Sequence, residues 1–287
     1  MAADHYAASG TRWALGAELV YRPIAAALVA TSPHRLSGHI VLDAGAGTGA
    51  ASAALRRCGA QVVATDLSPA MLAWQRAARP PCAAADIRAL PLPLDTVDDS
   101  VAAFVLNHLG DPGTGLAELA RVTRPGGAIL AAVFANDSRS DARDRIDAAA
   151  VAAGWQAPAW YREMKTAAAP VLGTAEAMAA AARAAGLGRV HARERSVDVG
   201  VTKAGQLVRY RLGHPAFAAW LDALGPARAA GFATVAERAV GGAIAPYRPR
   251  VVFLRAVTVP ARGRRRPGPA TGGSDPDAAA GPRPAES

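Results

Sequence analysis

The stretch His39-Ile-Val-Leu-Asp-Ala-Gly-Ala-Gly-Thr-Gly49 decides the fold. It begins with a short apolar run that is typical of a buried strand and continues as a turn with three alternating glycines. Glycine lets the backbone turn tightly and lets a ligand approach the main chain. Residues 50–58, rich in alanine, follow as a predicted helix. The stretch therefore predicts a strand, a ligand-binding loop and a helix in succession.

Outward from this loop, strands and helices alternate along the chain. Further strands are predicted at 61–65, 82–85, 101–106 and 128–134, one helix opens at Ser68-Pro69 with the serine as N-cap, and another spans 112–122. This rhythm predicts a parallel sheet with helices on both faces. Right-handed crossovers then bring the loops after the strands to one edge of the sheet, where ligands bind.

The remaining segments extend this sheet and cover its ligand-binding edge. Helices are predicted at 138–153, 174–185 and 204–240, and two last strands at 189–199 and 251–259. Residues 1–36 have helical periodicity, and Pro23 predicts two short helices or a kink there. We expect 1–36, 135–173 and 200–248 to form a roof over the site. Residues 261–287, rich in Pro, Gly and Arg, cannot bury a core and are predicted to be disordered.

Composition narrows the class of protein. The chain has 287 residues, of which 51% are hydrophobic, but no run of 18 apolar residues that would predict a membrane span. The N-terminus lacks a secretory signal, and Cys58 and Cys82 match no metal-ligand spacing, so we expect a cytoplasmic protein without a metal. The net charge is +9, yet no motif that reads nucleic acid accompanies it.

The acids after the first two strands leave two classes of ligand open. Gly45-x-Gly47-x-x-Ala50 matches the dinucleotide pattern, and Asp66 lies at the end of the second strand, where it can accept hydrogen bonds from both hydroxyls of a ribose. A nicotinamide dinucleotide and S-adenosylmethionine (SAM) both contain such a ribose. Up to this point either ligand is compatible with the sequence.

Asp43 separates these two interpretations. A carboxylate two residues before the first glycine would repel a pyrophosphate, whereas it favours the sulfonium and ammonium groups of SAM. Asp86 ends the third strand, where it can accept a hydrogen bond from the adenine amino group. These features favour SAM over a nicotinamide oxidoreductase.

Four motifs in order resemble those of class I SAM-dependent methyltransferases. They read Val41-Leu-Asp-Ala-Gly-Ala-Gly-Thr-Gly49, Val63-Ala-Thr-Asp-Leu-Ser-Pro-Ala-Met-Leu72, Ala85-Asp-Ile-Arg-Ala-Leu-Pro91 and Arg121-Val-Thr-Arg-Pro-Gly-Gly127. The chain is most similar to the group that methylates small molecules, among them quinone precursors and natural products. Only Leu94-Asp-Thr-Val-Asp-Asp-Ser100 departs from the common pattern, in which a Phe-Asp pair precedes the fourth strand.

The resemblance implies a fold and a domain organisation. The fold is a Rossmann-like, doubly wound, mostly parallel seven-stranded sheet with helical lid insertions. The implied parts are an N-terminal helical lid (1–36), a SAM-binding core (37–134), the rest of the core with substrate-side helical insertions (135–260) and a disordered tail (261–287).

The resemblance also implies roles for the residues around the methionine part of SAM. Asp43 and the backbone of Gly45, Gly47 and Gly49 would lie along it, and Asn107 would form the floor near the sulfonium. Asp43 could instead cap the loop, and asparagine is also common at strand ends, so these structural alternatives stay open.

The adenosine part would be held by residues after the second and third strands. Asp66 would hold the ribose and Leu67 would pack on the adenine. Asp86 would accept from the adenine amino group, with the backbone of Ile87 beside it. The alternative for Asp86 is a solvated turn acid next to Arg88.

His108 is the candidate catalytic base, because the family often places residues near the transferred methyl group at this point; a structural histidine is the alternative. Further candidates on the roof segments are His5, Tyr6, Tyr21 and His214. The aromatic residues on the roof could line an apolar substrate pocket or could serve ordinary helix packing; they are Trp155, Trp160, Tyr161 and Phe217. Cys82 precedes its strand and is no candidate nucleophile, and Asn107-His-Leu-Gly110 lacks the run that methylates nucleic-acid amino groups.

The sequence thus predicts methyl transfer from SAM to the oxygen, nitrogen or carbon of a small molecule by direct displacement, with no specific nucleic-acid partner. A SAM-binding protein without catalysis and, less favoured, an NAD(P)-dependent oxidoreductase remain as alternatives. The acceptor and the oligomeric state stay open.

Overall fold

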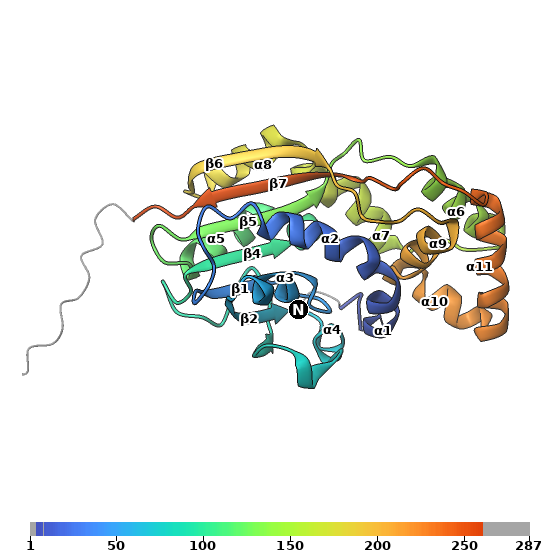
Figure 1. Cartoon of the computed structure of the whole chain (residues 1–287), viewed down its shortest axis with the longest axis horizontal. Helices are drawn as coiled ribbons and strands as arrows, with labels where there is room; N and C mark the ends of the chain where they lie inside the picture. Colours follow the sequence, from blue (N-terminus) through green and yellow to red (C-terminus); the bar gives the residue numbers. More distant parts are fainter. Residues whose placement is uncertain (1–3, 8, 261–287) are drawn as a thin grey trace, which may run out of the picture.

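A seven-stranded sheet forms the centre of the molecule in the computed structural model, which describes residues 4–7 and 9–260 (Figure 1). The strand order is β3-β2-β1-β4-β5-β7-β6. In chain order the strands are β1 (Ile40–Ala44), β2 (Gln61–Asp66), β3 (Cys82–Ala84), β4 (Asp99–Ala103), β5 (Ala128–Phe134), β6 (Gly188–Ser196) and β7 (Arg250–Val257). The predicted tail at 261–287 lies outside the described residues.

The sheet is mostly parallel, as predicted. The first five strands pair in parallel, whereas β7 runs antiparallel to both β5 and β6. Strand β1 lies between β2 and β4, with Leu42 opposite Val63 on one side and Ser100 on the other. The order reverses next to β1, and such a switch point is where open α/β sheets bind ligands.

Two apolar layers cover the two faces of the sheet. On one face, α2 (Glu18–Val29) and α3 (Ala50–Arg57) pack against alternate strand residues that include Val41 and Val101. On the other, α5 (Pro112–Val122) and α8 (Ala175–Ala184) pack against Leu42 and Ala102. Successive strand residues point to opposite faces, so each strand contributes to both layers. The predicted three-layer α/β arrangement is confirmed.

The N-terminal helix is not interrupted at Pro23. The chain runs from α1 (Gly10–Arg12) through a π-helical turn, η1 (Trp13–Ala17), into α2, which contains Pro23 in its interior. Of the two predicted alternatives, the division into two short helices at this proline is wrong. A proline inside a helix costs ~3 kcal/mol. The complete burial of Val20, Ile24 and Leu28 on the sheet offsets that cost.

The roof consists of more and shorter helices than predicted. They are α6 (Asp141–Ala152), α7 (Ala159–Glu163), η4 (Met164–Ala168), η5 (Ala169–Leu172), α9 (Ala204–Leu212), α10 (Pro215–Leu224) and α11 (Pro226–Val240). The stretch 204–240, predicted to be helical, forms three helices, and Pro215 and Pro226 are the first residues of the second and third. Apart from η5, which returns the chain to α8, these helices gather beyond the carboxyl ends of β4 and β5 together with α1 (Figure 1).

Four short elements complete the chain: α4 (Pro69–Ala73), η2 (Arg76–Ala78) and η3 (Leu106–His108) are helical turns on the ligand-binding side, and residues 4–7 form a turn before α1. Ser68 is the N-cap of α4, as predicted, but its side chain makes no capping hydrogen bond. Within the described residues, no helix is both long and apolar enough to cross a bilayer.

Candidate cofactor and acceptor site

The glycine loop adopts backbone conformations that favour glycine. Gly45, Gly47 and Gly49 have φ values of +70°, +52° and +103°. A Cβ atom at Gly45 would also lie 2.4 Å from Cβ of Val105, so no larger residue fits there. The loop that follows β1 can therefore bend closely against the end of β4, as the sequence predicted.

Asp43 is sealed behind this loop. Its side chain is fully buried, its Oδ2 accepts a hydrogen bond of 2.6 Å from the hydroxyl of Ser52, and its Oδ1 has no partner. Burial raises the pKa of Asp43 to about 6, although the hydrogen bonds from Ser52 and the charge of Arg79 lower it. A carboxylate without contact to solvent acts on a ligand in the loop through its charge.

Asp66 braces the loop from the end of β2. Its carboxylate accepts hydrogen bonds from the backbone N–H groups of Gly47, at 2.7 Å, and Ser68, at 2.8 Å. Burial raises its pKa, although these two hydrogen bonds lower it. A carboxylate has about four acceptor positions, so the half-buried group retains capacity for ribose hydroxyls. The neighbouring Leu67 leaves 41% of its surface exposed, as an apolar platform for a ring would.

Asp86 forms a local ion pair. It accepts hydrogen bonds from Nε and Nη2 of Arg88 at 2.9 and 2.5 Å, and these hydrogen bonds lower its pKa. This is the arrangement of the alternative interpretation, a turn acid next to Arg88. An adenine amino group would have to share the carboxylate with that arginine. Ile87 is 6% exposed and its side chain belongs to the apolar layer under α5.

Two residues that the sequence did not single out also reach the loop. Glu18 of α2 is buried and accepts hydrogen bonds from the Thr48 hydroxyl and from Arg22. Arg79 lies beside Gly49, and its buried Nε and Nη2 atoms have no partner. A single acid among the apolar residues of α2 was a usable signal for Glu18. The sequence holds none for Arg79, which precedes β3 in an irregular segment.

The turn after β4 carries the other predicted site residues. Phe104 has a φ of +62°, a strained conformation for an aromatic residue, and the chain then enters η3. Asn107 lies on η3 with its Oδ1 buried and without a partner. His108 follows, and its Nε2 lies 3.3 Å from the hydroxyl of Tyr6.

His108 has part of its surface exposed, and the ring of Tyr6 lies 5.7 Å from its ring. Desolvation lowers its pKa to about 4, and the charge of His5 lowers it further. Desolvation also raises the pKa of Tyr6. At neutral pH the contact therefore joins a neutral imidazole to a protonated phenol.

Aromatic rings from the roof and from β4 and β5 lie next to His108. Tyr6 contacts Trp13 with 5.6 Å between ring centroids, Trp13 contacts Tyr21 at 4.7 Å, and Tyr21 meets Phe104 edge-on at 4.8 Å. His5 stacks on Trp160 at 4.6 Å. Of the predicted candidates, the structure thus brings His5, Tyr6, Tyr21 and Trp160 to the same side as His108.

Trp155 and Phe217 have the structural role that the sequence analysis gave as their alternative. Their rings stack at 4.1 Å, both side chains are buried, and Nε1 of Trp155 donates a 2.9 Å hydrogen bond to the carbonyl of Ala216. They join α10 to the segment after α6.

A close helix crossing fixes the roof to the N-terminal helix. A Cβ atom at Gly16 would lie 2.4 Å from the carbonyl oxygen of Arg209 and 3.0 Å from Cα of Gly213. The absence of side chains at both glycines lets η1 approach α9 at van der Waals distance. This crossing brings Trp13 to within 5.3 Å of the His214 ring.

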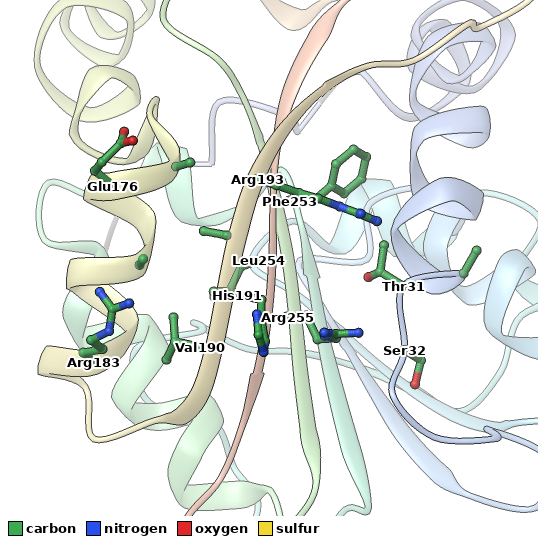
Figure 2. A pocket seen from close by; sticks show the side chains of 14 residues that line it. Thr31, Ser32, Glu176, Arg183, Val190, His191, Arg193, Phe253, Leu254 and Arg255 are labelled. Carbon is green, nitrogen blue, oxygen red and sulfur yellow. The ribbon is translucent and has the colours of Figure 1, made fainter.

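A separate hollow lies at the β6 edge of the sheet. Figure 2 shows it between α8 and the end of α2. Its volume is about 680 Å³, and its lining includes His191, Arg193 and Arg255. None of the predicted site residues lines it. This hollow is therefore separate from the predicted cofactor site at the glycine loop.

Comparison with known proteins identifies the core. Residues 42–131 match the model of a family described as a methyltransferase domain. Residues 42–131 are therefore a methyltransferase domain. Its matched residues begin within β1 and end within β5, so they contain the glycine loop, Asp66 and Asp86. The domain's cofactor is SAM, in agreement with the prediction from Asp43.

Two curated relatives and one solved structure show how far the similarity extends. The demethylmenaquinone methyltransferase of Mycolicibacterium paratuberculosis is 35% identical over 138 residues, 48% of this chain and 58% of that protein. The malonyl-[acyl-carrier protein] O-methyltransferase of Halorhodospira halophila is 41% identical over 120 residues, 39% of this chain and 40% of that protein. The chain thus spans less than two thirds of the length of these relatives.

The solved structure of a SAM-dependent methyltransferase from Thermotoga maritima, described as a possible histamine N-methyltransferase, has the same fold. It superposes with a TM-score of 0.53 at 15% identity and covers 86% of this chain and 94% of that one. The methyltransferase domain and its mostly parallel α/β fold are therefore as the sequence predicted.

Proposed function

We propose that the chain transfers the methyl group of SAM to a small-molecule acceptor. The observation that carries the proposal is the buried carboxylate of Asp43, with an unpartnered oxygen, behind a glycine loop that a ligand can approach. A pyrophosphate next to that charge would be repelled, whereas a sulfonium cation is attracted.

The residues at the loop fit SAM. Asp43 and Asp66 supply negative charge, and Asp66 retains acceptor capacity beside its two backbone hydrogen bonds. Arg79, with two unpartnered nitrogens next to Gly49, would face the carboxylate of the methionine part. Asn107 has an unpartnered buried oxygen on the β4 side. Leu67 would lie against the adenine, and Asp86 and Ile87 would lie near its edge.

When bound, SAM supplies a methyl group already activated by the sulfonium. The protein then has to align the acceptor, and such alignment can be worth ~10⁵–10⁸ M in effective concentration. The aromatic residues around His108 exclude water from the acceptor. His108, held by Tyr6, accepts the acceptor's proton if the nucleophile is a hydroxyl or an activated carbon.

A small acceptor group is supported by two relatives, a demethylmenaquinone methyltransferase and a malonyl-[acyl-carrier protein] O-methyltransferase. We also propose a cytoplasmic location and an acceptor other than nucleic acid, because the chain has no motif that reads nucleic acid.

Incubation with methyl-labelled SAM and fractionated small-molecule extracts tests the proposal, with SAM binding measured in parallel by calorimetry. We expect labelled product from the wild type and at least tenfold less from Asp66→Asn. Asp198→Asn, which changes an exposed acid paired with Arg248, is the matched control and should behave as the wild type. Absence of both SAM binding and labelled product would refute the proposal.

A SAM-binding protein without catalysis is the second candidate, and the lowered pKa of His108 favours it, because a weakly basic imidazole is a poor general base. SAM binding without labelled product from any extract would support this candidate.

A further inference from the structure

A buried arginine joins two helices of the roof. Arg211 of α9 is 5% exposed and forms a two-pronged ion pair with Asp147 of α6, with distances of 2.6 and 2.8 Å. Its Nη2 also donates to the hydroxyl of Tyr161 at 3.0 Å, and its guanidinium lies 4.8 Å from the centre of the Phe217 ring. Both carboxylate oxygens of Asp147 therefore bind Arg211, and the single negative charge of Asp147 neutralises that arginine alone.

Arg143, one turn earlier on α6, has weaker compensation. Its side chain is 20% exposed, its nearest carboxylate is Asp144 at 3.9 Å, and that carboxylate is 58% exposed. Nη2 of Arg143 donates to the carbonyl of Ser138 at 3.3 Å. Desolvation lowers the pKa of Arg143, but the nearby phenols of Tyr247 and Tyr210 raise it. Arg143 and Asp147 are four residues apart, so they share the face of α6 that meets α9 through Arg211. Because its nearest carboxylate is distant and exposed, most of the charge of Arg143 is unopposed.

Two polar atoms in the same region have no partner. The hydroxyl of Tyr247, a residue that is 6% exposed, and Nε2 of His214 are both buried without a hydrogen bond. Burial lowers the pKa of His214, and the positive charges of Arg211, Arg143 and Lys165 lower it further. A buried polar atom without a partner costs ~1–3 kcal/mol. A ligand with acceptor atoms would remove that cost.

Aromatic rings connect this region to the predicted site of methyl transfer. From His108 the contacts run through Tyr6 and Trp13 to His214, with 5.7, 5.6 and 5.3 Å between successive ring centroids. The Tyr210 ring lies 5.1 Å from His214 and 5.8 Å from Tyr247. The rings form an apolar wall between His108 at one end and the unpartnered groups at the other.

We propose that the acceptor is an aromatic carboxylic acid whose carboxylate binds Arg143, His214 and Tyr247, while its ring packs along the aromatic wall toward His108. This inference rests on the proposed function, since it names the acceptor class of the same site. A planar carboxylate offers acceptor atoms to a guanidinium and to a phenol at once, and such charge-assisted bonds are about twice as strong as neutral ones. The rings select the aromatic body of the ligand.

Benzoate and its neutral analogue benzamide test this site in the full chain. Binding of each is followed by calorimetry and by the shift in melting temperature, in wild type and in Arg143→Gln. We expect benzoate to stabilise the wild type and benzamide to have little effect, and Arg143→Gln to weaken benzoate binding about tenfold or more. Tyr247→Phe, which removes one hydroxyl, should weaken benzoate binding in the same direction.

Arg145→Gln is the matched control, because Arg145 lies on the same helix with an exposed side chain and donates only to the carbonyl of Val240. Equal binding of benzoate and benzamide, equal losses in the Arg143 and Arg145 variants, or no benzoate binding up to about 10 mM would overturn the inference. SAM titration of the same samples separates the two levels, since loss of SAM binding in the wild type would refute the proposed function instead.

Discussion

The glycine loop and the roof bury charges of opposite sign. Around the glycine loop, the three carboxylates of Asp43, Asp66 and Glu18 outnumber the buried guanidinium of Arg79. In the roof, Arg211 contacts Asp147 and Tyr161, and Arg143 lies one turn before Asp147 on α6, so two guanidinium groups are present for one partly buried carboxylate. In each region part of the charge has no full partner within the protein.

The difference indicates which ligand each region accommodates. Buried charge without a partner is costly, and a ligand of opposite sign removes the cost. The loop region therefore suits a cation, as the sulfonium of SAM is, and the roof region suits an anion. A methyl donor and an acceptor of opposite charge would meet at η3, which carries Asn107 and His108.

The largest effect is expected in the roof. Asp147→Asn leaves Arg211, which is 5% exposed, without its carboxylate partner. Removal of one member of a buried ion pair typically costs ~3–5 kcal/mol, and the 30% exposure of the Asp147 side chain reduces this to about 3 kcal/mol here. Urea unfolding at pH 7 measures the loss. Asp144→Asn, an exposed acid on the same helix, should change the free energy of unfolding by less than about 0.5 kcal/mol.

At the glycine loop, a substitution is expected to increase the free energy of unfolding instead of lowering it. Asp43→Asn keeps an acceptor for Ser52 but removes the buried charge. Because the pKa of Asp43 is about 6 in the folded state and 3.8 in the unfolded reference, the wild type binds more protons when folded. The contribution of Asp43 to the free energy of unfolding is therefore fully present below pH 4 and is lost as the pH rises through 6. At pH 7 the variant should be more stable than the unliganded wild type by about 2–3 kcal/mol.

The measurement is the free energy of unfolding from pH 4 to 7 without SAM. We expect the two proteins to converge near pH 4 and to diverge above pH 6. A constant difference over this range would show that the Asp43 carboxylate does not carry the charge described here.

The smallest effect concerns the contact between the two regions. Tyr6→Phe removes the hydroxyl that lies 3.3 Å from Nε2 of His108. Loss of about 1 kcal/mol of positioning predicts a roughly fivefold lower turnover with an unchanged KM for SAM. In His108→Gln the same tyrosine substitution should cause no additional loss, because the partner is already absent. Additive losses would mean that Tyr6 acts independently of His108.

The same comparison explains what the sequence could predict. Asp43, Asp66 and Asp86 each lie at or just beyond the carboxyl end of a strand, so the strand pattern alone places them at one edge of the sheet. The roof depends on contacts between distant segments: Tyr6 with His108, and Asp147 with Arg211, are 102 and 64 residues apart. Local patterns contain no record of such pairs.

Two particular errors follow from the same cause. Pro23 was predicted to divide or kink its helix, but the helix continues through it, because burial of the surrounding apolar residues on the sheet outweighs the local cost of proline. Glu18 was missed because its role depends on the position of Thr48, thirty residues along the chain. His108 was found by its place after the fourth strand, while its partner Tyr6 could only be listed among several roof residues.

The affinities of SAM and S-adenosylhomocysteine, which differ in the methyl group and its positive charge, test the central claim most directly. Calorimetry at pH 7.5 should show that the wild type prefers SAM more than Asp43→Asn does, with the ratio of the two dissociation constants reduced roughly tenfold in the variant. A ratio that is the same in both proteins would contradict the claim that the buried carboxylate behind the glycine loop recognises the cationic sulfur.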